Sequence, residues 1–256
     1  MGTGLTVFTG NIGCGKSLLA SKLAKMGTVI VNMDSIQQMV SGGAYGQYDK
    51  EKKDVYWAAE NATIEAALKS NLSVVIDRTN MDRKRRERFI AIGKKYGAKI
   101  VSYNWGAGTE HDLQRRLENC RGVSEETWRS VFEYMQKSYE PPSVGEGFDT
   151  IIEPPKKFKF YAFDFDGTIV ENKFPEIGEI INGTVEKMNA LWESLSNIII
   201  VWSCRGGKYS NQMREFMIKN KIPFDFINEN PIFNTGSPKV FAHEYYDDRN
   251  IPIGDL

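Results

Sequence analysis

The chain of 256 residues predicts an α/β protein made of two domains, each built on a parallel sheet. Apolar runs of strand length alternate with helical stretches in the first half. A glycine-rich loop follows the first of these runs, and an apolar run in the second half ends in two closely spaced aspartates. Strands that alternate with helices are typical of an open parallel sheet, which binds its ligands beyond the carboxyl ends of the strands. The residues that directly follow each strand are therefore the first candidates for function.

The first element is a strand over residues 5–8, followed by the loop GNIGCGKS at positions 10–17 and a predicted helix over 18–26. Glycines let consecutive backbone N–H groups surround phosphate oxygens. Lys16 can reach the terminal phosphates, and the Ser17 hydroxyl can ligate Mg²⁺ at the positive end of the helix. The loop therefore predicts a site for ATP with Mg²⁺, and a glycine-rich turn without a ligand is the alternative. The residues expected to bind the nucleotide are Gly10, Gly13, Cys14, Gly15, Lys16, Ser17 and Leu18, and Lys16 is also expected to act in catalysis.

Further strands are predicted over 28–31, 72–76 and 98–103, helices over 35–40, 55–69 and 83–96, and the run 148–152 is a candidate for a last strand. Asp34 follows the second strand and is the candidate general base, because a carboxylate beside an acceptor hydroxyl can orient it and remove its proton. An N-cap of the next helix is the alternative role for Asp34. After the third strand, Asp77 is placed like an acid that holds Mg²⁺ through water, and Thr79 and Asn80 are expected to contact the acceptor.

A helical pair predicted over 110–138 carries arginines of the kind that stabilise the charge on a transferring phosphate. Arg121 is the first choice for this role, whereas ion pairs on a surface helix explain Arg115 and Arg116 equally well. The basic run RKRRER at 83–88 fits a solvated helix face and a groove for a phosphate backbone equally well. Among the tryptophans, Trp105 is the one whose predicted loop suits stacking on a base.

The second half contains the apolar strand 160–163, which continues into DFDGT at positions 164–168. Residues two apart in a strand point to the same side, so Asp164 and Asp166 can converge on one ligand. One carboxylate can act as a nucleophile that takes a phosphoryl group while the other protonates the leaving oxygen, and Mg²⁺ relieves the repulsion between them. A calcium site, or surface acids after a strand, is the alternative.

These residues resemble the first motif of the haloacid dehalogenase superfamily of aspartate-nucleophile phosphatases, and three downstream segments look like its later motifs. The segments between the motifs are too short for a large cap, so we expect a Rossmann-like domain with an open site, which suits a large substrate. The resemblance implies a phosphate-binding hydroxyl and an arginine after the second strand, a third-motif cation, and a Mg²⁺ site. The hydroxyl and the arginine are those of Ser203 and Arg205, and the third-motif cation is Lys239. The Mg²⁺ site is formed by Asp164, Asp166, Asp247 and Asp248.

The whole chain resembles the bacteriophage family of bifunctional polynucleotide kinase-phosphatases, which joins an N-terminal P-loop kinase to a C-terminal phosphatase. The interrupted, proline-rich stretch 139–157 predicts a boundary near Pro155, so the kinase domain is expected over 1–155 and the phosphatase domain over 156–256. The resemblance implies that the protein phosphorylates 5'-hydroxyl ends and removes 3'-phosphates in RNA or DNA repair. It also implies Asp34 as the base, Arg121 as the lid arginine, nucleic acid ends as partners and a functional link to a ligase. The family has an arginine three residues after the base that helps to hold the acceptor's phosphate, and Gln37 takes that place here.

Composition narrows the classes of function. The net charge is zero, so any contact with nucleic acid must be local. Three scattered cysteines and two histidines offer neither a disulfide framework nor a zinc site, and no run approaches a membrane span. We expect a soluble, unprocessed protein of the cytoplasm, that of the host cell if a phage encodes it, and leave a homo-oligomer open. Two rival functions remain: a kinase-phosphatase of nucleosides or nucleotides, and a nucleotide-gated binding module.

Overall fold

The structure is a computed structural model that describes residues 3–42, 48–231 and 239–249. The chain divides into two compact units, Met1–Lys156 and Lys157–Leu256. The boundary expected from the sequence, near Pro155, lies beside this division. None of the helices in the described ranges has the length and apolar composition that a bilayer crossing requires.

The first unit is built on a five-stranded parallel sheet with the strand order β2-β3-β1-β4-β5. The predicted last strand is confirmed, since β5 pairs in parallel with β4. The elements in chain order are β1 (Gly4–Thr9), α1 (Lys16–Lys25), β2 (Val29–Asn32), α2 (Met33–Ser41), η1 (Lys50–Lys52), α3 (Lys53–Lys69), β3 (Val74–Asp77), α4 (Arg83–Lys95), β4 (Lys99–Asn104), α5 (Glu110–Leu117), α6 (Glu125–Lys137), η2 (Val144–Glu146) and β5 (Thr150–Ile152).

Local sequence explains where the helices begin. Gly15 has a φ of 94° and precedes α1, so the helix begins at Lys16 and not at the predicted residue 18. The side chain of Asn32 accepts a hydrogen bond from the Ser35 N–H and so caps α2, and Asp82 caps α4 in the same way. These side chains satisfy N–H groups that no helical carbonyl can reach.

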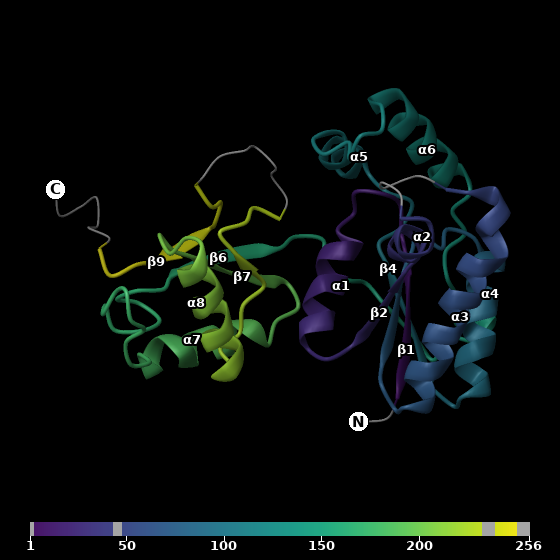
Figure 1. The fold of residues 1–256 in the computed structure, drawn as a ribbon. Coiled ribbons are helices and arrows are strands. Elements are labelled where there is room, and N and C mark those ends of the chain that lie inside the picture. The colour runs from purple at the N-terminus through teal and green to yellow at the C-terminus, as the bar shows by residue number, and fades with distance from the viewer. Residues whose placement is uncertain (1–2, 43–47, 232–238, 250–256) are drawn as a thin grey trace. The chain divides into compact units, whose positions relative to one another are not determined.

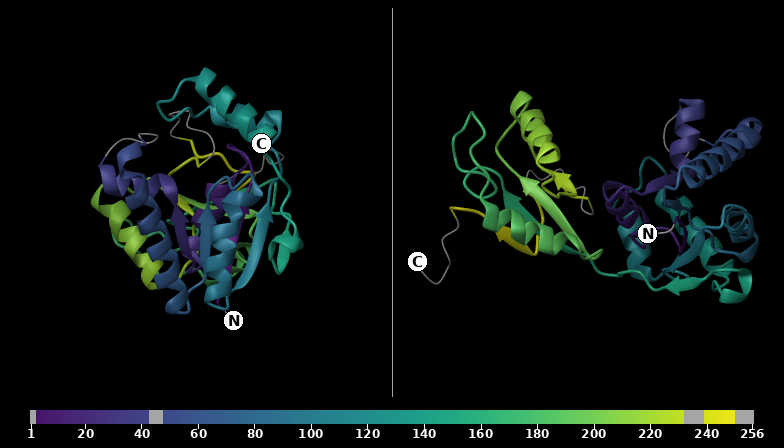
Figure 2. Two further views of the ribbon diagram at one scale, coloured as in Figure 1. Left: turned by 90° about the vertical axis from the view of Figure 1, so that its right-hand side faces the viewer. Right: turned by 90° about the horizontal axis from the view of Figure 1, so that it is seen from below.

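Helices cover both faces of this sheet, with α1 on one side and α3 and α4 on the other (Figure 1). Beyond the carboxyl ends of the strands lie α5 and α6, at the end of the sheet opposite the N-terminus (Figure 2). We refer to residues 105–138, which contain these two helices, as the lid segment. The core cluster of the unit joins strand residues to α3 and α4, and includes Leu5, Val7, Val74, Ile76, Ile64, Phe89 and Ile90.

The second unit is built on a four-stranded parallel sheet with the order β8-β7-β6-β9. Met188 of α7 and Met213 and Met217 of α8 share a core cluster with Phe163 and Val201, so both helices pack against one face of the sheet. Between β6 and β7 the chain adds the loop 165–181 and α7. The elements are β6 (Lys159–Asp164), α7 (Asn182–Trp192), β7 (Asn197–Trp202), α8 (Lys208–Lys219), β8 (Phe226–Ile227) and β9 (Glu244–Tyr246).

The strand register decides which residues meet at the carboxyl ends of the two sheets. In the first sheet, Asn32 of β2 lies in register with Asp77 of β3. In the second sheet, Asp164 of β6 lies in register with Trp202 of β7, and the preceding residue of β6 lies in register with Tyr246 of β9. The polar residues that follow these strands are therefore gathered at one end of each sheet, as the sequence predicts.

Candidate active sites

The phosphate-binding loop connects β1 to α1 and encloses the ammonium group of Lys16. The Lys16 Nζ donates a hydrogen bond to the Asn11 carbonyl at 2.5 Å and lies 3.3 Å from the Cys14 Sγ. Both side chains are buried. Burial raises the pKa of the Cys14 thiol, although the nearby Lys16 charge opposes this.

Two glycines of the loop lie where no side chain would fit. Gly13 has a φ of 77°, and a Cβ added there would lie 1.9 Å from the carbonyl oxygen of Asp112 in α5. A Cβ on Gly10 would lie 2.8 Å from the Cβ of Trp105. The lid segment therefore packs directly on the loop at these positions. Leu18, also expected to bind nucleotide, is half-buried on α1.

Ser17 and Asp77 form the part of this site that suits a divalent cation. The Ser17 hydroxyl hydrogen-bonds the Asp77 carboxylate, and the Asn32 Nδ2 donates to Asp77 Oδ2 at 3.1 Å. Burial raises the pKa of Asp77, against the lowering effect of the Lys16 charge. Hydroxyl and carboxylate oxygens are ligands that Mg²⁺ prefers, and a cation would offset the cost of burying the carboxylate charge, so these residues fit Mg²⁺. Sequence reasoning gave no role to Asn32, although its place at the end of β2 is a usable signal.

Asp34 lies half-buried in the first turn of α2. Its negative charge contributes to the raised pKa of Asp77, so the two carboxylates are close enough to interact. The alternative role of Asp34 as the cap of α2 is wrong, because Asn32 provides the cap. Gln37 lies three residues further along α2, also half-buried, and residues three apart share one face of a helix.

The segment after β3 is hydrogen-bonded to β1 and to the first residue of the phosphate-binding loop. Asn80 is 1% exposed, and its Nδ2 donates to the Phe8 carbonyl at 2.8 Å. The prediction that Asn80 contacts the acceptor is therefore wrong, because its amide is bound to β1 and hidden from any ligand. Thr79 is half-buried, and its carbonyl accepts a hydrogen bond from the Gly10 N–H at 2.9 Å.

Asn11 fastens the loop to the lid segment. Its Nδ2 donates to the carbonyls of Ala107 at 2.8 Å and Phe132 at 3.0 Å, and its side chain is fully buried. Two lid carbonyls that are far apart in the sequence thus share one donor in the loop. The loop pattern allows any residue at position 11, so nothing in the pattern indicated this role.

Among the lid arginines, Arg115 forms an ion pair within its own helix, α5, as the surface-helix alternative predicts. Its Nη2 donates to Asp112 Oδ1 at 2.6 Å, and Asp112 is the residue whose carbonyl packs on Gly13. Arg121 lies exposed in the turn between α5 and α6, the two helices of the predicted pair, with a φ of 51°. Its role as the lid arginine stays a prediction.

Three arginines of the basic run at 83–88 form ion pairs with acidic residues of the same unit. Arg86 is fully buried and forms a two-point ion pair with Glu146, with both N–O distances 2.8 Å. Arg88 pairs with the fully buried Glu60, which also binds Arg78 at 3.0 Å. Arg86 and Arg88 therefore fit neither of the two alternatives for this run, because both are paired within the fold, whereas Arg83 and Lys84 are exposed and fit a solvated helix face.

Trp57, not Trp105, presents an exposed ring in the first unit. Trp105 is 7% exposed and packs edge-on against Phe8, with 4.9 Å between ring centres. The prediction that Trp105 offers a stacking surface is therefore wrong. Trp57 on α3 is 44% exposed, and the Lys53 Nζ lies 4.8 Å from its ring centre.

In the second unit, Asp164, Asp247 and Asp248 bring carboxylate oxygens within 4.8 Å of one another. Asp164 ends β6, and the other two directly follow β9, the neighbouring strand. Burial raises the pKa of Asp164 to about 6, and the negative charges of Asp247, Asp166 and Asp248 add to this effect. A divalent cation would relieve the repulsion within this cluster, and three carboxylates are a donor set that Mg²⁺ prefers.

Asp166 does not join this acidic cluster. Its carboxylate accepts two hydrogen bonds from Arg205, from Nε at 2.7 Å and from Nη2 at 2.6 Å. Arg205 is 2% exposed and also donates to the carbonyls of Pro175 and Glu176. The prediction that the Asp166 side chain ligates the metal is therefore corrected, because Arg205 turns the carboxylate away from the other acids and fixes its direction.

Ser203 follows β7 at the same end of the sheet. Its N–H donates to the Asn228 Oδ1 at 2.8 Å, and its Oγ accepts from the Arg205 N–H at 3.1 Å. The Lys239 Nζ lies 5.9 Å from the ring centre of Tyr245 on β9. The structure thus fixes Ser203 beside the end of β6 and places Lys239 against β9.

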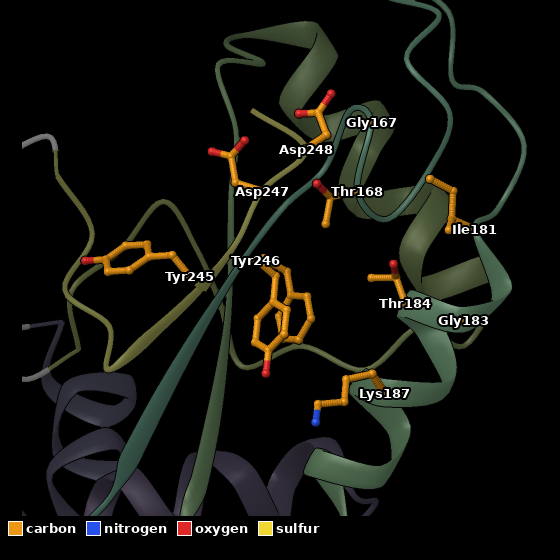
Figure 3. A pocket seen from close by; sticks show the side chains of 11 residues that line it. Gly167, Thr168, Ile181, Gly183, Thr184, Lys187, Tyr245, Tyr246, Asp247 and Asp248 are labelled. Carbon is orange, nitrogen blue, oxygen red and sulfur yellow. The ribbon is translucent and has the colours of Figure 1, made fainter. Parts of the chain in front are cut away.

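A pocket of about 490 Å³ opens beside the acidic cluster (Figure 3). Asp247 and Asp248 lie at one end of the view, Lys187 lies at the other, and the ring of Tyr246 lies between them (Figure 3). Sequence reasoning did not find this pocket, because α7 carries no motif and its distance from β9 depends on the fold. The pocket is lined by Phe163, Gly167, Thr168, Ile181, Gly183, Thr184, Lys187, Tyr245, Tyr246, Asp247 and Asp248.

Several solved structures are similar to this chain. A conserved protein coded by a locus of Bacteroides thetaiotaomicron is 34% identical, with a TM-score of 0.33 and coverage of 39% of this chain and 82% of that one. A chain of the Pnkp1/Rnl/Hen1 RNA repair complex is 18% identical, with a TM-score of 0.44 and coverage of 97% and 90%. A fungal RNA kinase is 17% identical, with a TM-score of 0.42 and coverage of 61% and 77%.

A family model described as an AAA domain matches residues 5–142 of the chain. The match contains the phosphate-binding loop, the strands β1 to β4 and the lid segment. It spans more than half of the 256 residues. Because this match covers most of the unit that carries the phosphate-binding loop, the protein belongs to the AAA domain family.

Proposed function

We propose that the protein is a bifunctional enzyme that heals polynucleotide ends. Its first unit transfers the γ-phosphoryl group of ATP to a 5'-hydroxyl end, and its second unit, a haloacid dehalogenase-type phosphatase, hydrolyses a 3'-phosphate end. One observation supports the proposal: each sheet has, beyond its carboxyl end, side chains of the types that one of the two phosphoryl transfers requires. Those groups belong to Lys16, Ser17, Asp34 and Asp77 in the first unit, and to Asp164, Asp166, Asp247 and Asp248 in the second.

In the first unit, Asp34 accepts the proton of the acceptor hydroxyl as its oxygen attacks the γ-phosphorus and the bond to the β-phosphate oxygen breaks, which releases ADP. Lys16 stabilises the negative charge on the phosphates, and Arg121, in the exposed turn between the two lid helices, is proposed to do the same from the lid side. Mg²⁺ held by Ser17 and Asp77 would supply further neutralisation of phosphate charge. Gln37, on the Asp34 face of α2, is proposed to hydrogen-bond the acceptor end.

In the second unit, a carboxylate oxygen of Asp164 attacks the phosphorus, the bond to the ester oxygen breaks, and Asp166 donates a proton to the leaving alcohol. Asp166 then takes a proton from water as that water attacks the aspartyl phosphate and releases inorganic phosphate. In the structure Arg205 binds both oxygens of the Asp166 carboxylate, so the proposed proton transfer requires that Asp166 leave this ion pair when substrate binds. Mg²⁺ held by Asp164, Asp247 and Asp248 would offset the charge that raises the pKa of Asp164.

The test uses a single-stranded oligonucleotide with a 5'-hydroxyl and a 3'-phosphate, incubated with ATP and Mg²⁺, and resolves both ends by mass. We expect gain of the 5'-phosphate and loss of the 3'-phosphate. Lys16→Ala should block only the first change and Asp164→Asn only the second. The matched controls Lys69→Ala and Glu215→Gln alter exposed residues outside both sites and should block neither.

The two rival functions predict other outcomes of the same experiment. If neither end changed while nucleosides or nucleotides gained phosphate, the first unit would be a small-molecule kinase, and the proposal would be wrong. If neither end and no small acceptor changed while ATP bound through Lys16, a nucleotide-gated binding module would be the better description.

A further inference from the structure

The pocket beside the acidic cluster has opposite charge at its two ends. Asp247 and Asp248 lie at one end, next to the proposed nucleophile Asp164, and Lys187 of α7 lies at the other (Figure 3). Gly183 and Lys187 both line the pocket, and four residues of helix span about 6 Å. A ligand that has a phosphate at the acidic end and extends along α7 would therefore bring its other end to the Lys187 ammonium.

Lys187 has no hydrogen-bond or ion-pair partner among the residues that the structure describes. Its charge acts on the pKa of Glu244, but that carboxylate is already bound by the Lys159 ammonium and by the Tyr246 hydroxyl. The Lys187 side chain is exposed and reaches the pocket. An anion in the pocket would therefore meet an ammonium group that no carboxylate neutralises directly.

The middle of the pocket suits the body of a nucleotide. The ring of Tyr246 lies in the centre of the view, and its position is fixed by stacking on Phe163 with 4.4 Å between ring centres (Figure 3). Tyr246 is half-buried, so part of its ring offers a flat apolar surface for a base or a sugar.

We propose that this pocket holds the nucleotide that carries the phosphate under attack, and that Lys187 binds a second phosphate on the other side of its sugar. The inference rests on the proposed phosphatase function and names its substrate class, a nucleotide phosphorylated at both its 3' and its 5' positions. The volume of about 490 Å³ lies within the range of pockets that hold small organic ligands, about 300–1,000 Å³. Lys187 is then a specificity residue, because it distinguishes this class from a simple phosphate monoester.

The second phosphate can belong to a free nucleoside bisphosphate or to the last linkage of a polynucleotide, and the two sources are separable. We would compare nucleoside 3'-monophosphate with nucleoside 3',5'-bisphosphate. We would also compare two oligonucleotide 3'-phosphates whose last linkage is an ordinary phosphodiester or a neutral methylphosphonate. In each pair, the substrate with the second charge is expected to have a kcat/KM about tenfold higher, because only its charge is attracted by the exposed Lys187 ammonium. A preference in the first pair alone would identify a free nucleoside bisphosphate as the source of the second phosphate. A preference in the second pair would identify the last linkage of a polynucleotide as that source.

Three variants test whether Lys187 causes the preference for the substrate with the second charge. Lys187→Ala should remove the preference in each pair, and its kcat/KM for p-nitrophenyl phosphate, measured in parallel, reports whether the catalytic groups still work. Lys187→Arg should keep most of it, and Lys219→Ala, at the far end of α8, should behave like the unaltered protein. Hydrolysis of both members of each pair at equal rates by the unaltered protein, or an undiminished preference in Lys187→Ala, would overturn the inference. Failure to hydrolyse even p-nitrophenyl phosphate would instead refute the phosphatase function itself.

Discussion

Replacement of Asp164 by asparagine is expected to stabilise the second unit above neutral pH in the absence of Mg²⁺. Burial, with the charges of three neighbouring aspartates, raises the pKa of Asp164 to about 6 from an ordinary value of 3.8. A raised pKa means that the protonated form contributes stability that is fully present below about pH 4 and is lost as the pH rises through about 6. Asparagine does not ionise, so the variant does not lose stability in this way.

The size of the effect follows from the difference between the two pKa values. A difference of about 2 corresponds to about 3 kcal/mol, because one pKa unit is worth about 1.4 kcal/mol. Asp164 is only partly buried, and water screens part of this energy, so we expect about 1 to 2 kcal/mol. For a domain of 60–100 residues, 1 kcal/mol changes Tm by about 4–8 °C. The variant should therefore melt at least about 4 °C above the unaltered protein at pH 7.5.

Thermal unfolding of both proteins in EDTA, at pH values from 4 to 7.5, measures this difference. The gap in Tm should be small at pH 4 and grow through pH 6. Mg²⁺ at pH 7.5 should raise the Tm of the unaltered protein more than that of the variant, because the cation relieves the repulsion that the substitution has already reduced. Glu215→Gln removes a charge from an exposed position of the same unit and should show neither effect. A gap that does not depend on pH, or a lower Tm of the variant at pH 7.5, would refute the electrostatic reasoning.

Three further predictions concern the first unit. Arg86→Met should destabilise it by about 3–5 kcal/mol in urea unfolding, because Glu146 is left buried without its partner, and a loss under 1 kcal/mol would contradict this. Gly13→Ala should weaken ATP binding at least about tenfold in a fluorescence titration, since the new Cβ collides with Asp112 and the left-handed φ disfavours alanine. Unchanged affinity for ATP would show that the loop accommodates the extra methyl group, against this prediction. Asn11→Ala should make limited proteolysis of the lid segment about tenfold faster, because two lid carbonyls lose their shared donor, and an unchanged cleavage rate would mean that other contacts hold the lid.

The sequence was informative wherever the chemistry follows from neighbours along the chain. The loop at 10–17 and the pair Asp164 and Asp166 are defined by spacing within a few residues, and so are the strands that precede them. Because parallel strands place their carboxyl ends together, position after a strand was enough to select Asp34 and Asp77 as candidates, whereas Asp247 was selected by its resemblance to a phosphatase motif. Helix boundaries were less accurate, since a glycine or a capping side chain decides them locally, as Gly15 does for α1.

The tertiary structure alone decided which of these residues contact one another. It bound Asp166 to Arg205, buried Asn80 under the loop, and used Asn11 to join the loop to the lid segment. It also brought Lys187 of α7 to the pocket that ends at the acidic cluster. Periodicity and spacing determine which elements form and which face they bury. The direction of a side chain and its partner far away in the sequence depend on how the elements pack, and no local pattern contains that information.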